Sequence, residues 1–258
     1  MTIVFELAQR AVIVTGGTHG IGRGIAERFL EAGAEVLVCA RQAPVSPISA
    51  AGREAVFVPA NVRVPEDVAR VFAAAQARFG RLDVLVNNAG GSPPVEAATA
   101  SSKFFAAVID LNLTAAFVVA QHANAVMQRQ AEGGCIINIA SVSATRPSPG
   151  TAAYGAAKAG LLSLTQSLAV EWAPKVRVNA VTPGLILTER AEQHYGAESS
   201  LEAIAATVPL GRFGTAREVA DACLFFASPL ASYVSGASLV LHGGGEQPAF
   251  LAAAKAPR

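Results

Sequence analysis

The sequence is poor in charged residues and in cysteine, and this narrows the partners and the kinds of site that we expect for the protein. Only 15% of the 258 residues are charged, whereas about 25% is typical of a soluble domain. The net charge is +1 without a long basic run, so nucleic acid is not an expected partner, because phosphate binding needs clustered lysine and arginine. Three cysteines in apolar surroundings, Cys39, Cys135 and Cys223, predict buried reduced thiols. The four histidines lack metal-ligand spacing, so no metal site is expected.

No membrane span or export signal is expected either. We find no apolar stretch that approaches the roughly 18 residues of a membrane helix. The N-terminal residues Met1–Arg10 include Glu6 and lack a basic n-region, which is unlike a signal peptide, so the protein is predicted to be cytoplasmic. Two features would each account for the low charge content: a parallel sheet buried on both faces, and contacts between subunits. A homo-oligomer is therefore predicted.

Short apolar runs alternate with helical patterns along the chain. Strands are predicted at Ala11–Thr15, Glu35–Cys39, Ala55–Val58, Val84–Asn87, Cys135–Ala140, Arg177–Val181 and Ser238–Leu241. Helices are predicted from the turn after the first strand to Ala32-Gly33, at Pro65–Phe79, at about Lys103–Arg129 and at about Ala152–Trp172. This rhythm predicts one α/β domain over residues 1–258, a doubly wound parallel sheet of about seven strands flanked by helices. Its ligands would bind at the carboxyl ends of the strands.

Two segments depart from this rhythm. Leu185–Gly214 interrupts the repeat and holds polar residues, which predicts a lid over a substrate. The tail Glu246–Arg258 is rich in alanine and is either frayed or docked on a neighbouring subunit.

A glycine-rich turn follows the first strand and opens the first helix. Gly16, Gly20 and Gly22 in Thr15–Gly22 let the backbone turn tightly and approach a ligand, and the helix N-terminus presents N–H groups to a pyrophosphate. A tight turn without a ligand is the alternative, because this spacing departs from the general G-x-G-x-x-G pattern.

Five motifs in register resemble those of the short-chain dehydrogenase/reductase family. They are T-G-x-x-x-G-x-G at Thr15–Gly22, NNAG at Asn87–Gly90, LNLT around Asn112, Y-x-x-x-K at Tyr154–Lys158 with Ser141 ahead of it, and PGLILT at Pro183–Thr188. The resemblance runs from about residue 9 to residue 245. It implies a Rossmann-like fold and transfer of a hydride between a nicotinamide cofactor and a carbonyl or alcohol. The cofactor contacts that it implies are Gly16, Thr18, His19, Gly20, Ile21, Gly22, Arg41, Asn61, Val62, Asn88, Ala89, Gly90, Tyr154, Lys158, Pro183, Gly184, Ile186 and Thr188.

The catalytic residues expected are Asn112, Ser141, Tyr154 and Lys158. Tyr154 and Lys158 lie four apart on a predicted helix and share one face, and a nearby ammonium lowers the pKa of a tyrosine. Tyr154 is predicted to be general acid in reduction and general base in oxidation, and Ser141 to hydrogen-bond the substrate oxygen. The resemblance implies that Asn112 anchors a water that joins Lys158 to solvent. The alternative is an ordinary amphipathic helix on which the two residues happen to be neighbours.

The end of the predicted second strand favours NADP(H) over NAD(H). An acidic residue there would bind the adenosine ribose hydroxyls, but this chain has Ala40 followed by Arg41. Arginine can bind a 2′-phosphate through two charge-assisted hydrogen bonds, and His19 could add a donor. Arg41 as a solvated loop residue is the alternative, and NAD(H) stays open.

Two positions differ from the pattern of the family. Asn61-Val62 stands where relatives have Asp-Val, and the Asn61 oxygen could still accept a hydrogen bond from adenine. Lys175 stands where relatives usually have glycine.

The substrate remains open between a steroid, an acyl thioester, a quinone and a small ketone. Relatives that reduce 3-oxoacyl groups on acyl carrier protein often carry arginine where this chain has Cys135, which weakens that reading. The predicted lid favours a fairly apolar substrate through Leu185, Ile186, Leu187, His194, Tyr195 and Phe213.

The alternative to an enzyme is a protein that binds NADP(H) as a sensor and catalyses no reaction. The resemblance further implies a tetramer built through the two long helices.

Overall fold

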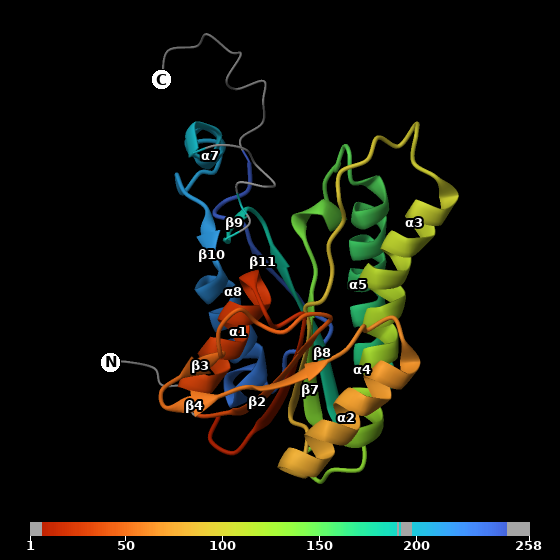
Figure 1. Ribbon diagram of the computed structural model, residues 1–258, viewed down its shortest axis with the longest axis vertical. Helices are drawn as coiled ribbons and strands as arrows, with labels where there is room; N and C mark the ends of the chain where they lie inside the picture. Colours follow the sequence, from red (N-terminus) through yellow and green to blue (C-terminus); the bar gives the residue numbers. More distant parts are fainter. Residues whose placement is uncertain (1–6, 190, 192–197, 247–258) are drawn as a thin grey trace.

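Seven parallel strands form the central sheet of the computed structural model, which describes residues 7–189, 191 and 198–246 (Figure 1). The strands are β1 (Ala11–Thr15), β2 (Glu35–Ala40), β5 (Val56–Pro59), β6 (Val84–Asn87), β7 (Gly134–Ile139), β8 (Val176–Pro183) and β11 (Ser238–Leu241). Their spatial order is β11-β8-β7-β6-β1-β2-β5. The predicted fold class and strand number are confirmed. β1, β6 and β11 have the predicted bounds, and the other four strands differ at one or both ends by one or two residues.

The strand order reverses between β1 and β6, which lie next to each other in the sheet. All five residues of β1 are buried, because helices cover both faces of the sheet and a continuous apolar run is stable only there. In a doubly wound sheet, ligands bind beside such a reversal at the carboxyl ends of the strands. The glycine-rich turn begins at this point.

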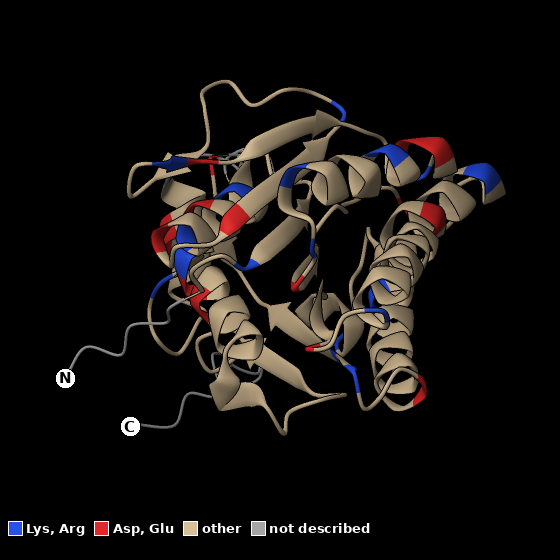
Figure 2. Cartoon of the chain, turned by 90° about the horizontal axis from the view of Figure 1, so that it is seen from below, with Lys and Arg blue, Asp and Glu red and all other residues tan. Residues whose placement is uncertain are grey.

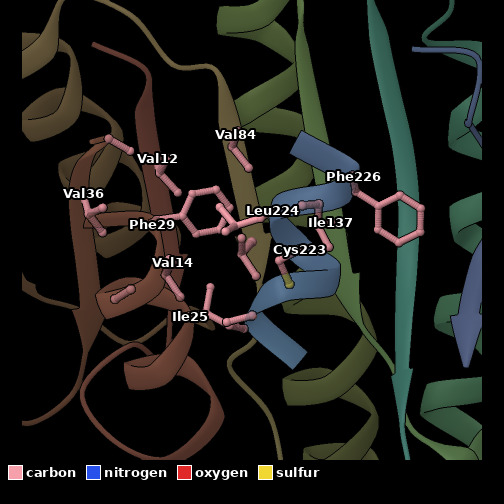
Figure 3. Close-up of a cluster of buried hydrophobic side chains, with 14 of the residues drawn as sticks. Val12, Val14, Ile25, Phe29, Val36, Val84, Ile137, Cys223, Leu224 and Phe226 are labelled. Atoms are coloured by element: carbon pink, nitrogen blue, oxygen red, sulfur yellow. The ribbon is translucent and has the colours of Figure 1, made fainter. Parts of the chain in front are cut away.

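Helices cover the sheet in two layers (Figure 1). On one face lie α1 (Gly20–Glu31) and α8 (Ala216–Ala227), and on the other lie α2 (Pro65–Phe79), α4 (Ala115–Met127) and α5 (Ala152–Glu171). Figure 3 shows the core under the first pair, where Phe29 of α1 and Leu224 of α8 meet Val12 and Val84 of the sheet. Burial of each such side chain stabilises the fold by about 1.5–3 kcal/mol.

Helix ends follow local signals. α1 ends at Glu31 and is followed by Gly33 with φ +89°, and α2 begins at Pro65 and ends before Gly80 with φ +70°. The sequence pattern did not predict α8, although Thr215 and Glu218 form a complete capping box at its start.

One long helical path joins α3 (Ser102–Ile109), the π-helical turn η1 (Asp110–Thr114) and α4. By length and composition, Ser102–Met127 could cross a membrane, which corrects our expectation that no apolar stretch approaches that size. In the fold, residues of α4 such as Val119 and Ala123 pack on the sheet, as in the core helix of an α/β domain. Only 28% of the apolar window is buried within one chain, so an apolar face points outward.

Small elements complete the described part of the chain. A hairpin joins β3 (Ser49–Ala50) to β4 (Arg53–Glu54), and β9 (Ile186–Leu187) pairs in parallel with β10 (Gly214–Thr215). The β9–β10 pair fixes the two ends of the predicted lid, which also contains α7 (Glu198–Ala205). The short 3₁₀ helices η2 (Val142–Ala144) and η3 (Pro229–Ala231) follow β7 and α8. Acidic and basic residues are interspersed over the molecule (Figure 2).

Candidate active site

The turn after β1 has the geometry of a cradle for a ligand. Gly16 and Gly20 have φ values of +64° and +55°, a region that favours glycine. A Cβ on Gly22 would collide with the carbonyl oxygen of Gly16 and the amide of Asn88. The N-cap residue His19 makes no side-chain capping hydrogen bond, and the first turn of α1 holds no acidic residue. This end of α1 therefore suits the negative charge of a diphosphate.

Asn88 and Ala89 hold the turn from the neighbouring strand. The Asn88 Nδ2 donates to the carbonyl oxygens of Thr15 and Gly16 at 2.9 and 3.1 Å. The backbone N–H groups of Asn88 and Ala89 both donate to the Thr15 Oγ1 at 3.0 Å. These bonds join the ends of β1 and β6 across the reversal of strand order. Sequence reasoning omitted Thr15 from the site, although it belongs to the first motif.

Tyr154 and Lys158 lie on the first two turns of α5, and their four-residue spacing makes them neighbours on the surface of the helix. The Lys158 Nζ is 5.6 Å from the centre of the Tyr154 ring and donates a 2.7 Å hydrogen bond to the carbonyl oxygen of Ile139. Burial lowers the pKa of Lys158 to about 8, because a low-dielectric interior disfavours the ammonium. Ser141 follows β7 by two residues, and its Oγ accepts a hydrogen bond from the Ser143 N–H at 3.2 Å.

Asn112 lies in the π-helical turn η1 and is 1% exposed. Its Nδ2 donates to the carbonyl oxygens of Gly91 and Val108 at 3.0 and 2.9 Å, and its Oδ1 accepts from the Gly91 N–H at 2.8 Å. A Cβ on Gly90 would lie 2.6 Å from the Asn112 Oδ1 and 3.3 Å from the Lys158 Nζ. The π-helical turn η1 thus brings Asn112 beside Gly90, and Gly90 also lies beside Lys158.

A buried polar chain that sequence reasoning missed runs beneath these residues. The Asn87 Nδ2 donates to the Asn138 Oδ1 at 3.1 Å, and the Asn138 Nδ2 donates to the Thr165 Oγ1 at 2.9 Å. The chain fixes β6, β7 and α5 relative to one another, because a buried amide without partners is costly. A lone asparagine inside the apolar strand run CIINIA was the available signal for Asn138.

Comparisons with known proteins place this geometry in a family. A family model described as enoyl-(acyl carrier protein) reductase matches residues 16–246. An uncharacterized oxidoreductase of Mycobacterium tuberculosis is 36% identical over 246 residues, which cover 93% of this chain and 94% of that protein. The L-rhamnose 1-dehydrogenase (NAD(P)(+)) of Azotobacter vinelandii is 36% identical, with 92% and 97% covered. The chain belongs to the short-chain dehydrogenase/reductase family.

Relatives and solved structures of this family agree with the fold. A 3-oxoacyl-[acyl-carrier-protein] reductase of Synechocystis is 37% identical, with 92% of this chain and 97% of that protein covered. The structure of the aldohexose dehydrogenase of Thermoplasma acidophilum in ligand-free form has a TM-score of 0.87 at 31% identity, with 98% of both chains covered. The relatives are named dehydrogenases and reductases, so this chain is an NAD(P)-dependent oxidoreductase.

The residues expected at the adenosine end of a cofactor lie beside one another at the sheet edge. Arg41 directly follows β2 and is exposed, and Asn61 follows the adjacent β5. The Asn61 Oδ1 accepts from the Arg63 N–H at 3.2 Å, and its own N–H donates to the Asp67 carboxylate at 2.7 Å. That contact is the main reason why the pKa of Asp67 is lowered. Val62 is partly buried beside the same strands.

The structure explains one of the departures from the pattern of the family. The Lys175 Nζ donates to the carbonyl oxygens of Gln128 and Gln130 at 2.8 and 3.1 Å. Since these carbonyls follow the end of α4, the lysine satisfies groups that a glycine would leave to water.

The end of β8 and the start of the lid carry the remaining predicted cofactor contacts. Pro183 ends β8 and is buried, and a Cβ on Gly184 would lie 2.8 Å from the Cβ of His242. Ile186 and Phe213 are both 8% exposed and pack within the protein, so their apolar character says little about the substrate. A Cβ on Gly20 would lie 3.7 Å from the Thr188 Cγ2, which brings the lid over the glycine-rich turn. His194 and Tyr195 lie outside the described residues, as does the tail after Glu246.

Other chemistry is sparse in the described part of the chain. There, no group of three His, Cys, Asp or Glu could hold a metal ion. All three cysteines are buried and free, as predicted, and burial raises the pKa of the Cys39 thiol to about 12. These thiols are therefore poor nucleophiles at neutral pH.

Proposed function

We propose that this protein is an NADP(H)-dependent oxidoreductase that interconverts a carbonyl and a secondary alcohol through Ser141, Tyr154 and Lys158. The placement of Lys158 carries the proposal. Its ammonium is buried against the Ile139 carbonyl and lies 5.6 Å from the centre of the Tyr154 ring. A buried ammonium disfavours folding, and a residue with such a cost is commonly kept for function. With a pKa of about 8, Lys158 is largely protonated at neutral pH.

In the proposed mechanism, side chains of this protein transfer the proton, and a bound nicotinamide would donate or accept the hydride. In reduction, the Tyr154 hydroxyl donates its proton to the substrate oxygen, and in oxidation the phenolate takes a proton back. The Lys158 ammonium favours the phenolate by its charge, since an unperturbed tyrosine with a pKa near ~10 would release its proton poorly at pH 7. Ser141 donates a hydrogen bond to the substrate oxygen as negative charge develops there. Asn112 holds the loop at Gly91 and is proposed to anchor the water that links Lys158 to solvent.

For the cofactor, the glycine-rich turn would hold the diphosphate and Arg41 would read the 2′-phosphate. Support comes from the exposed position of Arg41 directly after β2, where a guanidinium can form charge-assisted hydrogen bonds with a phosphate. Ala40 adds no carboxylate to repel that phosphate. NADP(H) is therefore proposed as the preferred nucleotide.

A second candidate is reduction of a 3-oxoacyl thioester. The Synechocystis relative is named a 3-oxoacyl-[acyl-carrier-protein] reductase, and the matching family model is named for an acyl carrier protein substrate. Against it stands Cys135, which is 3% exposed inside β7 and offers no cation to an acidic carrier. The sugar dehydrogenases among the relatives point to a different substrate class.

The decisive experiment is a spectrophotometric screen, in which NADPH and NADH are supplied for reduction and NADP⁺ and NAD⁺ for oxidation. Ketones, a steroid, a quinone and acetoacetyl thioesters are tested for reduction, and aldoses are tested for oxidation. Tyr154→Phe is the control and should lower kcat by about 10²–10⁴-fold, whereas the dissociation constant for NADPH should change far less, because the aromatic ring stays in place. Tight NADPH binding by the wild type without turnover of any substrate would favour the sensor, and equal turnover by Tyr154→Phe would refute the mechanism.

We further propose that the protein assembles into a homotetramer. Much of the apolar stretch of α3 and α4 is only partly buried in one chain, Phe105 on α3 is 46% exposed, and on α5 the side chain of Val170 is 80% exposed. The edge strand β11 also exposes Leu239 and Val240. Apolar surface on both the helices and the edge strand suits a tetramer with two kinds of interface.

A further inference from the structure

One carboxylate of the lid lies at the glycine-rich turn. The backbone N–H of Gly20, the first residue of α1, donates a 2.7 Å hydrogen bond to the Glu189 Oε1. The two residues are 169 positions apart in the sequence. Glu189 directly follows Thr188, whose Cγ2 would lie 3.7 Å from a Cβ on Gly20, so the contact is part of a broader approach of the lid to the turn.

The position of this carboxylate is the one that a diphosphate would use. The first turn of α1 has no acidic residue and its N-cap His19 makes no capping hydrogen bond, so the positive end of the helix gains its negative charge from Glu189. A carboxylate and a phosphate oxygen compete for such a position, because both are anionic acceptors of backbone N–H groups. The Glu189 carboxylate and a phosphate oxygen cannot occupy the same position in front of the Gly20 N–H at the same time.

We propose that Glu189 is an intramolecular ligand of the phosphate-binding turn, which the diphosphate of the cofactor displaces when it binds. The residue thereby sets the affinity for the nucleotide and links its binding to movement of the segment that holds Thr188 and Glu189, since Glu189 must leave Gly20 as the diphosphate arrives. The inference rests on the proposed function for the identity of the diphosphate. Its physical basis is the contact between Glu189 and Gly20.

The test is the affinity of the full-length protein for two probes, NADPH measured by nucleotide fluorescence and inorganic pyrophosphate measured by calorimetry. Glu189→Gln keeps an acceptor oxygen and removes the charge, and it should tighten both dissociation constants by about fivefold. Glu189→Ala removes the acceptor as well and should tighten them by about tenfold. Glu202→Gln, at an exposed position on α7 of the same lid, is the matched control and should change neither.

Hydrogen exchange gives a readout that does not depend on a nucleotide. In the cofactor-free protein, the amide of Gly20 should exchange faster in Glu189→Ala than in the wild type, because it loses its acceptor. Unchanged or weaker binding of both probes by Glu189→Gln and Glu189→Ala would overturn the inference. If that happened while the wild type turned over NADPH through Tyr154, only the inference would fail. If NADPH bound no variant while pyrophosphate bound Glu189→Ala more tightly, only the proposed cofactor would fail.

Discussion

The ammonium of Lys158 donates a 2.7 Å hydrogen bond to the carbonyl oxygen of Ile139, the last residue of β7. This bond anchors α5 to the strand that leads to Ser141. Burial lowers the pKa of Lys158 from 10.5 to about 8, so the folded protein releases this proton at a lower pH than the unfolded chain. Between pH 8 and 10.5 the unfolded state binds more protons, and the contribution of this group to stability therefore rises with pH.

Lys158→Met tests this linkage. Without the buried ammonium, the variant should be more stable than the wild type at pH 7, and its advantage should shrink by about 2 kcal/mol between pH 7 and 9.5. Urea unfolding at the two pH values measures the difference. Lys103→Met removes an exposed lysine and serves as the control. An advantage that is equal at both pH values would contradict the proposed burial of charge at Lys158.

Gly22→Ala tests the cradle of the turn. The added methyl group would collide with the Gly16 carbonyl and the Asn88 amide, so we expect a loss of stability of about 1–3 kcal/mol and at least a 100-fold weaker affinity for NADPH. Thermal unfolding and fluorescence titration measure the two effects. Gly52→Ala, at φ +73° with no atom within 4 Å, should lose stability through backbone strain alone. Cofactor affinity that survives in Gly22→Ala would place the nucleotide elsewhere.

The sequence predicts those parts of this molecule that depend on local pattern. The buried run of β1 and the Pro65 start of α2 are visible in the residues themselves, because an apolar run fits a doubly covered sheet and proline fits the first helical turn. The spacing of Tyr154 and Lys158 places them on one helical face in the same way. These features need no knowledge of distant contacts.

The remaining features arise only when distant segments meet. The contact of Gly20 with Glu189 and the bond from Asn138 to Thr165 join residues that no spacing rule relates. The lid is the instructive case, since Ile186 and Phe213 suggested an apolar substrate in the sequence but are packed within the protein. Apolar character alone does not distinguish a side chain that meets a ligand from one that meets its own fold.

Val170→Asp tests the proposed tetramer. The side chain is 80% exposed on α5, and a carboxylate there should be costly in a desolvated interface. Sedimentation velocity should show a tetramer for the wild type and a dimer for the variant, because the exposed side chains of β11 are unchanged. Val45→Asp introduces the same charge at a fully exposed residue after β2 and should leave the tetramer unchanged. A wild type that sediments as a monomer at micromolar concentration would refute the assembly.

Arg41→Ala tests the preference for NADP(H). Loss of a charge-assisted contact with the 2′-phosphate should raise KM for NADPH by about 10- to 100-fold, whereas KM for NADH should stay unchanged, because NADH lacks that phosphate. Ala40→Asp should act in the same direction, since its carboxylate repels the phosphate and can bind the ribose hydroxyls. Arg78→Ala removes an exposed arginine from the last turn of α2 and controls for the loss of positive charge. Equal losses for both nucleotides in Arg41→Ala would mean that Arg41 supports only the loop, and a wild type that prefers NADH would refute the cofactor assignment itself.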